Sequence, residues 1–134
     1  MEEFKIEPYV GVGKINFGMS KAEIKTLIGN PVIETIGFLG FTEFQYKKFT
    51  IRFNKKGMVN EISFLSDVLV MINDIDIFNN PNSIKELTRL EKPLNTLGFK
   101  VFFNFGIAVT DFSKNKENKS ISVFSKELVK DWKD

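Results

Sequence analysis

Hydrophobic residues in the second half of this chain repeat the order of those in the first half, and this repeat constrains the fold more than any other feature. Self-similarity at a fixed spacing is the sequence signature of duplicated structural units, and here the spacing is roughly 60 residues. The matched pairs are Phe17 with Phe78, Ile24 with Ile84, Leu27 with Leu87, and Ile51 with Val109. Because the matches fall on strands and helices alike, they predict two copies of one structural unit.

The chain of 134 residues is predicted to form a single soluble α+β domain, residues 1–134. We expect one repeat at about 8–66, a second at about 67–125, and a C-terminal tail at 126–134. One unit alone cannot bury both a helix and a sheet face, whereas two units side by side can share a core. The sequence therefore predicts two helix-plus-antiparallel-strand repeats forming one sheet, with the helices packed on one face and the other face free.

The first helix carries the most complete local signal. Ser20 and Glu23 match the Ser-x-x-Glu capping box, in which each side chain accepts a hydrogen bond from the backbone N–H of the other residue. Ile24, Leu27 and Ile28 follow on one helical face, and a Gly-x-Pro sequence ends the helix. These residues predict a short amphipathic helix whose apolar face packs on the core.

The composition supplies a large apolar core. The chain contains 15 Phe, one Trp and two Tyr, and the Phe ring has no polar group that needs a partner. Most of the Phe rings are therefore expected inside. In the tail, Leu128, Val129 and Trp132 belong to a short amphipathic segment. We expect these three side chains to cover an open end of the core.

The residue types that catalysis and metal binding use most often are missing. The chain has no Cys and no His, which removes thiol nucleophiles, thiolate metal sites, the commonest general base and the commonest metal ligand. An enzyme that uses only carboxylates and Lys is the least favoured reading of this composition. We therefore predict a protein that is not an enzyme, with no catalytic residues, no metal site and no cofactor.

Charge and hydropathy narrow the range of partners. The net charge is only +2, whereas nucleic-acid binders usually carry a strong basic excess. No apolar run approaches the ~20 residues of a membrane span, and the first residues lack the basic and apolar regions of a signal peptide. The sequence predicts a cytoplasmic protein that binds neither nucleic acid nor membrane, and it leaves the oligomeric state open.

One stretch near the N-terminus resembles the opening of the β-lactamase inhibitor protein-like and SmpA/OmlA-like folds. It reads Gly13-Lys-Ile-Asn-Phe17-Gly18-Met19-Ser20-Lys-Ala-Glu23-Ile24, followed by Gly29-Asn30-Pro31. Proteins of these families often begin with a strand, Gly-Met-Ser/Thr, a capping Glu, a short helix and Gly-x-Pro, followed by antiparallel strands. The tandem arrangement resembles the two-repeat form of the inhibitors. The resemblance implies a bacterial protein of that fold, which binds another protein with its sheet face.

Two places are candidate contact surfaces. Phe38, Leu39 and Phe41 lie between glycines, where large apolar side chains are poorly placed to enter a core, and an exposed contact is one interpretation. The other is that this loop folds down over the helix end. Arg52 and Phe102 each alternate away from apolar neighbours and are predicted on the free sheet face, since aromatic residues beside Arg are typical interface anchors. A shift of one residue in register would instead put Phe102 in the core.

These observations predict a non-enzymatic protein-binding module, in its most specific form an intracellular immunity or inhibitor protein. Its partner is expected to be another protein. The predicted binding residues are Phe38, Leu39, Phe41, Arg52 and Phe102. The alternative prediction is a domain that holds a small apolar ligand in the Phe-rich interior.

Overall fold

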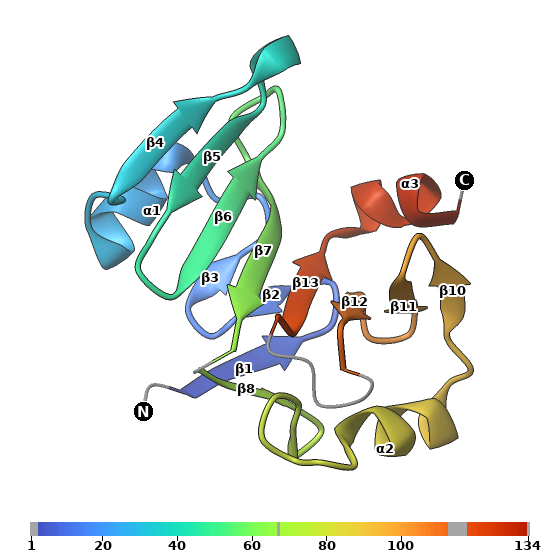
Figure 1. Cartoon of the computed structure of the whole chain (residues 1–134). Coiled ribbons are helices and arrows are strands. Elements are labelled where there is room, and N and C mark those ends of the chain that lie inside the picture. The colour runs from blue at the N-terminus through green and yellow to red at the C-terminus, as the bar shows by residue number, and fades with distance from the viewer. Residues whose placement is uncertain (1–2, 67, 113–117, 134) are drawn as a thin grey trace.

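The computed structural model describes residues 3–66, 68–112 and 118–133. The chain is mostly β, with 43% of it in strands and 21% in helices. The described strands form two sheets, which short helical segments flank and connect (Figure 1).

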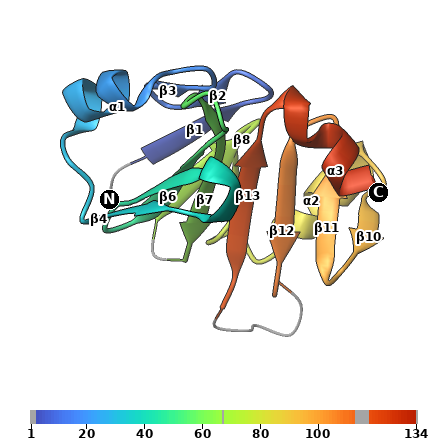
Figure 2. The same ribbon diagram turned by 90° about the horizontal axis from the view of Figure 1, so that it is seen from above.

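Eight antiparallel strands form the larger sheet, in the order β10-β11-β12-β13-β7-β6-β5-β4. Their bounds are β4 Ile33–Ile36, β5 Thr42–Gln45, β6 Phe49–Phe53, β7 Val59–Leu65, β10 Leu94–Thr96, β11 Phe99–Phe102, β12 Ile107–Thr110 and β13 Ser120–Phe124. The last strand, β13, pairs with β7 in the middle of the sheet, where Ser122 lies opposite Ser63. Strands β4–β7 and β11–β13 run in clearly different directions, so the sheet twists strongly where its two halves meet (Figure 2).

Five short strands form a second sheet, in the order β3-β2-β1-β8-β9. Their bounds are β1 Glu3–Glu7, β2 Gly11–Val12, β3 Ile15–Asn16, β8 Leu69–Ile72 and β9 Ile75–Asp76. Strands β1 and β8 run parallel, with Phe4 opposite Val70. This pairing joins the N-terminal segment to the segment that follows β7. The second sheet lies on one side of the larger sheet, together with α1 (Figures 1 and 2).

The hydrophobic core fills the space between the two sheets. Phe4 of β1 reaches the larger sheet, where its ring centroid lies 5.5 Å from that of Phe49 and 5.0 Å from that of Phe64. Ile51 of β6 and Ile62 of β7 are fully buried in the same core. Because successive side chains of a strand point to opposite faces, the residues that alternate with them face away from the second sheet.

The local signal for the first helix is confirmed. Helix α1 spans Lys21–Ile28 and begins with the predicted capping box. Ser20 Oγ accepts a hydrogen bond from the Glu23 N–H at 3.1 Å, and Glu23 Oε1 accepts one from the Ser20 N–H at 3.0 Å. The predicted apolar face is only partly buried, because Leu27 and Ile28 remain 37% and 36% exposed.

The predicted fold class is wrong: the chain is not an α+β arrangement of two helix-plus-antiparallel-strand repeats forming one sheet with the helices packed on one face. It is mostly β and has two sheets. The helices bury too little to form a layer, since α1 buries only Ile24, and α2 (Ser83–Leu90) buries only Ser83 and Leu87. Strands β1 and β8, which lie near the starts of the two predicted repeats, instead pair with each other. The second sheet that they belong to covers much of the core.

The C-terminal tail packs on the larger sheet. The sequence predicts that it covers an open end of the core, and in the structure it covers a second, smaller apolar cluster on this sheet. It consists of η3 (Lys126–Leu128) and α3 (Val129–Lys133). Its side chains Leu128, Val129 and Trp132 pack against a second, smaller core cluster of Val101, Ala108 and Phe124. Within the described part of the chain, no helix has both the length and the apolar character needed to cross a membrane.

Candidate binding face

Cross-strand pairing places a set of polar side chains on one face of the larger sheet. Paired residues of antiparallel strands point to the same side, so the register traces the face. One row runs from Glu43 through Arg52 to Glu61. A second row runs from Gln45 through Thr50 and Ser63 to Ser122. We call this the open face, and over β5, β6, β7 and β13 it comprises Glu43, Gln45, Thr50, Arg52, Glu61, Ser63, Leu65, Ser120 and Ser122.

Arg52 is held in the middle of the open face by three side chains. Its Nε donates to Glu43 Oε2 at 3.0 Å, and its Nη1 donates to Glu61 Oε1 at 3.1 Å and to Ser63 Oγ at 2.7 Å. Ser122 Oγ donates in turn to the other oxygen of the Glu61 carboxylate. The Arg52 side chain nevertheless keeps 40% of its surface exposed. The guanidinium is thus fixed in orientation while part of it stays available to a bound molecule.

Short side chains beside Arg52 leave the open face hollowed. Thr50, Ser63 and Ser122 follow one another across β6, β7 and β13. They are too small to fill the space above the sheet, and the hollow that results has a volume of about 760 Å³. Because the floor is built on strands, its donors and acceptors are held more rigidly than they would be on loops.

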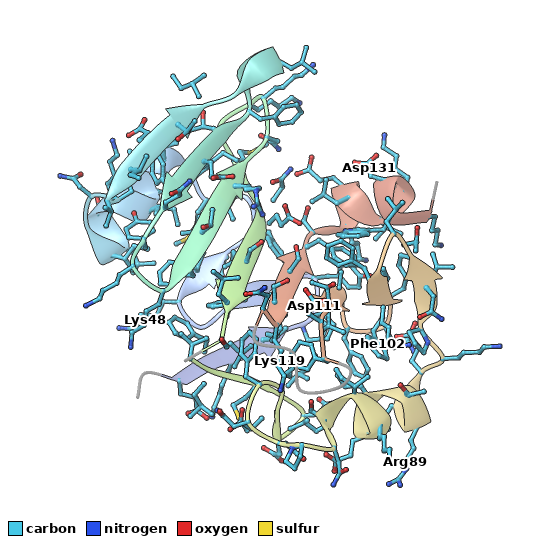
Figure 3. All side chains as sticks on the ribbon, viewed as in Figure 1. Lys48, Arg89, Phe102, Asp111, Lys119 and Asp131 are labelled. Atoms are coloured by element: carbon cyan, nitrogen blue, oxygen red, sulfur yellow. The ribbon has the colours of Figure 1, made fainter. Side chains whose placement is uncertain are left out.

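One end of the hollow combines positive charge with an exposed apolar side chain. Lys48 precedes β6, Leu65 ends β7 and Lys119 precedes β13, so the pairing of these strands brings the three residues to the same end of the sheet. Figure 3 labels Lys48 and Lys119 at this end. Leu65 is 67% exposed. Among the residues that the structure describes, the cations lining the hollow are Lys47, Lys48, Arg52 and Lys119, and the carboxylate lining it is Glu61. The hollow therefore favours a partner that brings negative charge.

Aromatic side chains border the hollow. Trp132 of α3 packs on Phe99 and Phe124, with ring centroids 5.2 Å and 5.8 Å apart. Phe99 and Trp132 line the hollow, so the tail covers one half of this sheet face and forms a wall beside the other half. Tyr46, between β5 and β6, also lines it. Burial raises the pKa of the Tyr46 hydroxyl above its usual value, and the nearby Glu34 carboxylate raises it further.

Of the two residues predicted for the free sheet face, Arg52 lies on the open face and Phe102 does not. Phe102 is 0% exposed and belongs to the main core, so its predicted position beside Arg52 is wrong. The alternation of residues along β11 could not reveal that Phe102 is buried, because both faces of this strand are covered. The tail covers the face opposite to Phe102, where Val101 is 0% exposed as well. Figure 3 shows Phe102 in the β11–β12 half of the molecule, away from the Lys48 end of the sheet. The aromatic rings that border the hollow include those of Tyr46, Phe99 and Trp132.

The predicted contact loop forms the turn η1 (Phe38–Gly40) between β4 and β5. Leu39 is 63% exposed and Phe41 is 44% exposed, so both side chains lie on the surface. The side chain of Phe38 lies outside the described residues. Neither Leu39 nor Phe41 lines the hollow. The structure therefore does not bring the loop and Arg52 together, and the loop is a separate surface.

Sequence reasoning did not select Glu61, Ser63, Leu65 or Trp132 as site residues. A signal was present in β7, where Glu61, Ser63 and Leu65 alternate with buried apolar residues. What the pattern does not reveal is that β13 and the tail, which come much later in the sequence, lie beside β7. Long-range pairing of this kind determines the site.

The chemistry of the open face suits recognition. It offers hydroxyl groups, a fixed guanidinium, ammonium groups and an exposed leucine on a rigid floor. Within the described residues, no group of three or more His, Cys, Asp or Glu side chains is placed to hold a metal ion. No protein-family model, no curated protein and no solved structure matches this chain.

Proposed function

We propose that this protein is a non-enzymatic binding module that holds another protein on its open face. The observation that carries the proposal is Arg52, which Glu43, Glu61 and Ser63 hold in one orientation at the floor of an exposed hollow. Arg and large aromatic side chains are over-represented among the residues that dominate the energy of protein interfaces. Because the guanidinium is already ordered, docking a partner on it costs less conformational entropy.

The charges around the hollow indicate the chemistry of the partner. Lys48 and Lys119 can pair with a carboxylate, and the exposed guanidinium of Arg52 can donate to a carboxylate or a backbone carbonyl. Leu65 and the Trp132 ring offer an apolar surface between these polar groups. A protein segment that carries an acidic residue close to an apolar one meets all of these groups at once.

A more specific form of the proposal concerns what the binding does. The resemblance of residues 13–31 to the β-lactamase inhibitor protein-like and SmpA/OmlA-like folds supports a bacterial module that blocks the activity of its partner. In this form it acts inside the cell as an immunity or inhibitor protein. The segment that carries the resemblance includes α1, whose capping box forms as the motif requires.

The alternative function, a small apolar ligand held in the Phe-rich interior, has less support. Buried rings pack closely on one another: the Phe44 and Phe53 centroids are 4.6 Å apart, and those of Phe4 and Phe64 are 5.0 Å apart. Rings in such contact leave little room between them for a ligand. The hollow that carries the polar groups lies on the surface.

Site-specific photo-crosslinking in cells of the source organism tests the proposal. A photoreactive phenylalanine analogue replaces Leu65 in the hollow, and in a matched control it replaces Lys85, an exposed residue of α2 outside the hollow. We expect Leu65 to give a crosslinked adduct with one protein, and the control to give none with that protein. Adding Arg52→Gln should remove the adduct, while circular dichroism confirms that the variant is folded. Equal capture from both positions, or no adduct at Leu65, would contradict the proposal.

A further inference from the structure

Strand β4 leaves one edge of the larger sheet unpaired. It is the last strand in the sheet order, and it pairs with β5 alone among the described strands. All four of its residues are exposed. An edge strand is usually protected by charge, and here the only charged residue is Glu34, which already pairs with Lys25 of α1 at 3.1 Å. The edge is therefore open to another strand.

Exposed apolar side chains surround this edge at both ends. Near the start of β4 they are Leu27, Ile28, Val32 and Ile33, with exposures of 37%, 36%, 74% and 52%. Near its end they are Ile36, Leu39 and Phe41, with exposures of 72%, 63% and 44%. Exposed apolar surface around a sheet edge is typical of an interaction site.

On the side away from β5, the backbone of β4 presents hydrogen-bonding groups at alternate residues. The Gly37 N–H donates to the Phe41 carbonyl at 2.6 Å, so Gly37 faces the β5 side of the strand. Because the direction of these groups alternates along a strand, Thr35 also faces β5, and Glu34 and Ile36 turn their backbone N–H and C=O groups outward. These two residues can bond to an added antiparallel strand.

We propose that the occupant of this edge is a second copy of the chain, whose own β4 pairs antiparallel about a twofold axis at Thr35. In this register Glu34 lies opposite Ile36 of the second copy, and the outward groups of the two residues meet. A register centred on Glu34 would instead put two carboxylates opposite each other, which is destabilising. The axis at Thr35 avoids that repulsion.

The same symmetry covers the apolar residues at both ends of the edge. Antiparallel pairing lays the start of one β4 beside the end of the other, so that Leu27, Ile28 and Val32 of one copy approach η1 and Phe41 of the second. At roughly 200 Å² for a fully exposed large apolar side chain, the seven exposed fractions amount to on the order of 700 Å² per copy, and a stable interface buries about 800 Å² per partner. The exposed apolar area around the edge is thus close to the area that a stable interface buries.

The dimer has a consequence for the open face. A twofold axis perpendicular to a sheet keeps each face on its own side, so the two open faces point in the same direction. Two copies of Arg52 would then stand on one side of a continuous sheet. The proposed dimer rests on the observations at the β4 edge alone and does not depend on the proposed function.

Sedimentation velocity of the full purified chain over a wide concentration range tests this inference. We expect a species of twice the 15.4 kDa chain mass, which Ile36→Lys converts to monomer. The matched control is Leu97→Lys, which changes an apolar residue that is 93% exposed near the opposite edge strand, β10, and should leave the dimer intact. A wild-type chain that stays monomeric at every concentration, or two variants with equal effects, would overturn the inference.

A disulfide trap tests the register separately. The chain has no Cys, so Thr35→Cys introduces a single thiol, and its partner can only be the same residue of another copy. Opposed residues of a non-hydrogen-bonded antiparallel pair have Cα atoms about 4.5 Å apart, which lies within the range that a disulfide spans. We expect rapid covalent dimers from Thr35→Cys and few from Glu34→Cys. The reverse order would contradict the axis at Thr35.

Discussion

Replacing Trp132 with Ala should loosen the C-terminal tail and lower the stability of the whole fold. The ring packs on Phe99 and Phe124 at 5.2 Å and 5.8 Å, and on the cluster that also contains Val101 and Ala108. A half-buried ring of this size removes on the order of 100–150 Å² from water. At about 25 cal/mol per Å², that burial contributes about 3 kcal/mol to stability. Because the unfolded chain already buries part of this surface, we expect a loss of about 2–3 kcal/mol in the free energy of unfolding.

Urea unfolding measures this loss, and far-UV circular dichroism is the suitable probe. Trp132 is the single Trp of the chain, so the variant has no Trp fluorescence to follow. The matched control is Asp131→Ala, a neighbouring exposed residue of α3, which should change the stability by less than ~0.5 kcal/mol. A Trp132→Ala variant as stable as the control would refute the conclusion that the tail packs on the sheet and forms a wall of the hollow.

Three further predictions concern the helix cap, the core and the alkaline limit of stability. Ser20→Ala removes the cap of α1 and should cost about 1 kcal/mol in urea unfolding, whereas no change would mean that the capping box contributes nothing. Phe102→Ala should cost about 3–5 kcal/mol, and Phe41→Ala, at an exposed ring, less than ~1 kcal/mol; equal losses would contradict the burial of Phe102. Burial raises the pKa of the Tyr9 hydroxyl, which donates to the Phe103 carbonyl, so the folded chain keeps a proton that the unfolded chain releases above pH ~10. Stability should therefore hold below that pH and fall as the pH rises through the folded pKa, and Tyr9→Phe should reduce this alkaline loss in thermal melts across the pH range.

Local structure could be predicted where a few neighbouring residues determine it. The capping box of α1 is complete within four residues, because Ser20 and Glu23 satisfy each other's backbone groups. The amphipathic tail was also readable, since Leu128, Val129 and Trp132 leave one apolar side that must be covered. In both cases the signal lies in a few neighbouring residues, although the surface that the tail covers comes from other parts of the chain.

The arrangement of the two sheets could not be predicted from such local signals. The strand β1 pairs with β8, from a distant part of the sequence, and this pairing creates the second sheet that the predicted single sheet lacks. The alternation of Phe4 and Ile6 with charged residues was a signal for β1, but nothing in the pattern names its neighbour. The predicted layer of helices is wrong for a related reason. Apolar periodicity shows which face a helix would bury, but it does not show that a second sheet covers the core in place of the helices.

The candidate site also contains one residue that the sequence pattern placed correctly and one that it did not. Arg52 was predicted on the free face because β6 buries only one of its faces, and alternation is informative there. Phe102 was misplaced because both faces of β11 are covered, one by the core and the other by the tail. Alternation carries no information about a strand that is buried on both sides.

Hydroxyl-radical footprinting of the chain, alone and with the protein captured at Leu65, tests the central claim most directly, because oxidation reports the exposure of each side chain. The claim is that the open face is the binding surface. Binding should protect Leu65 and Trp132, which line the hollow, and leave Leu97, 93% exposed at the opposite edge, as reactive as before. Protection of Leu97 with Leu65 still oxidised at its original rate would contradict the claim.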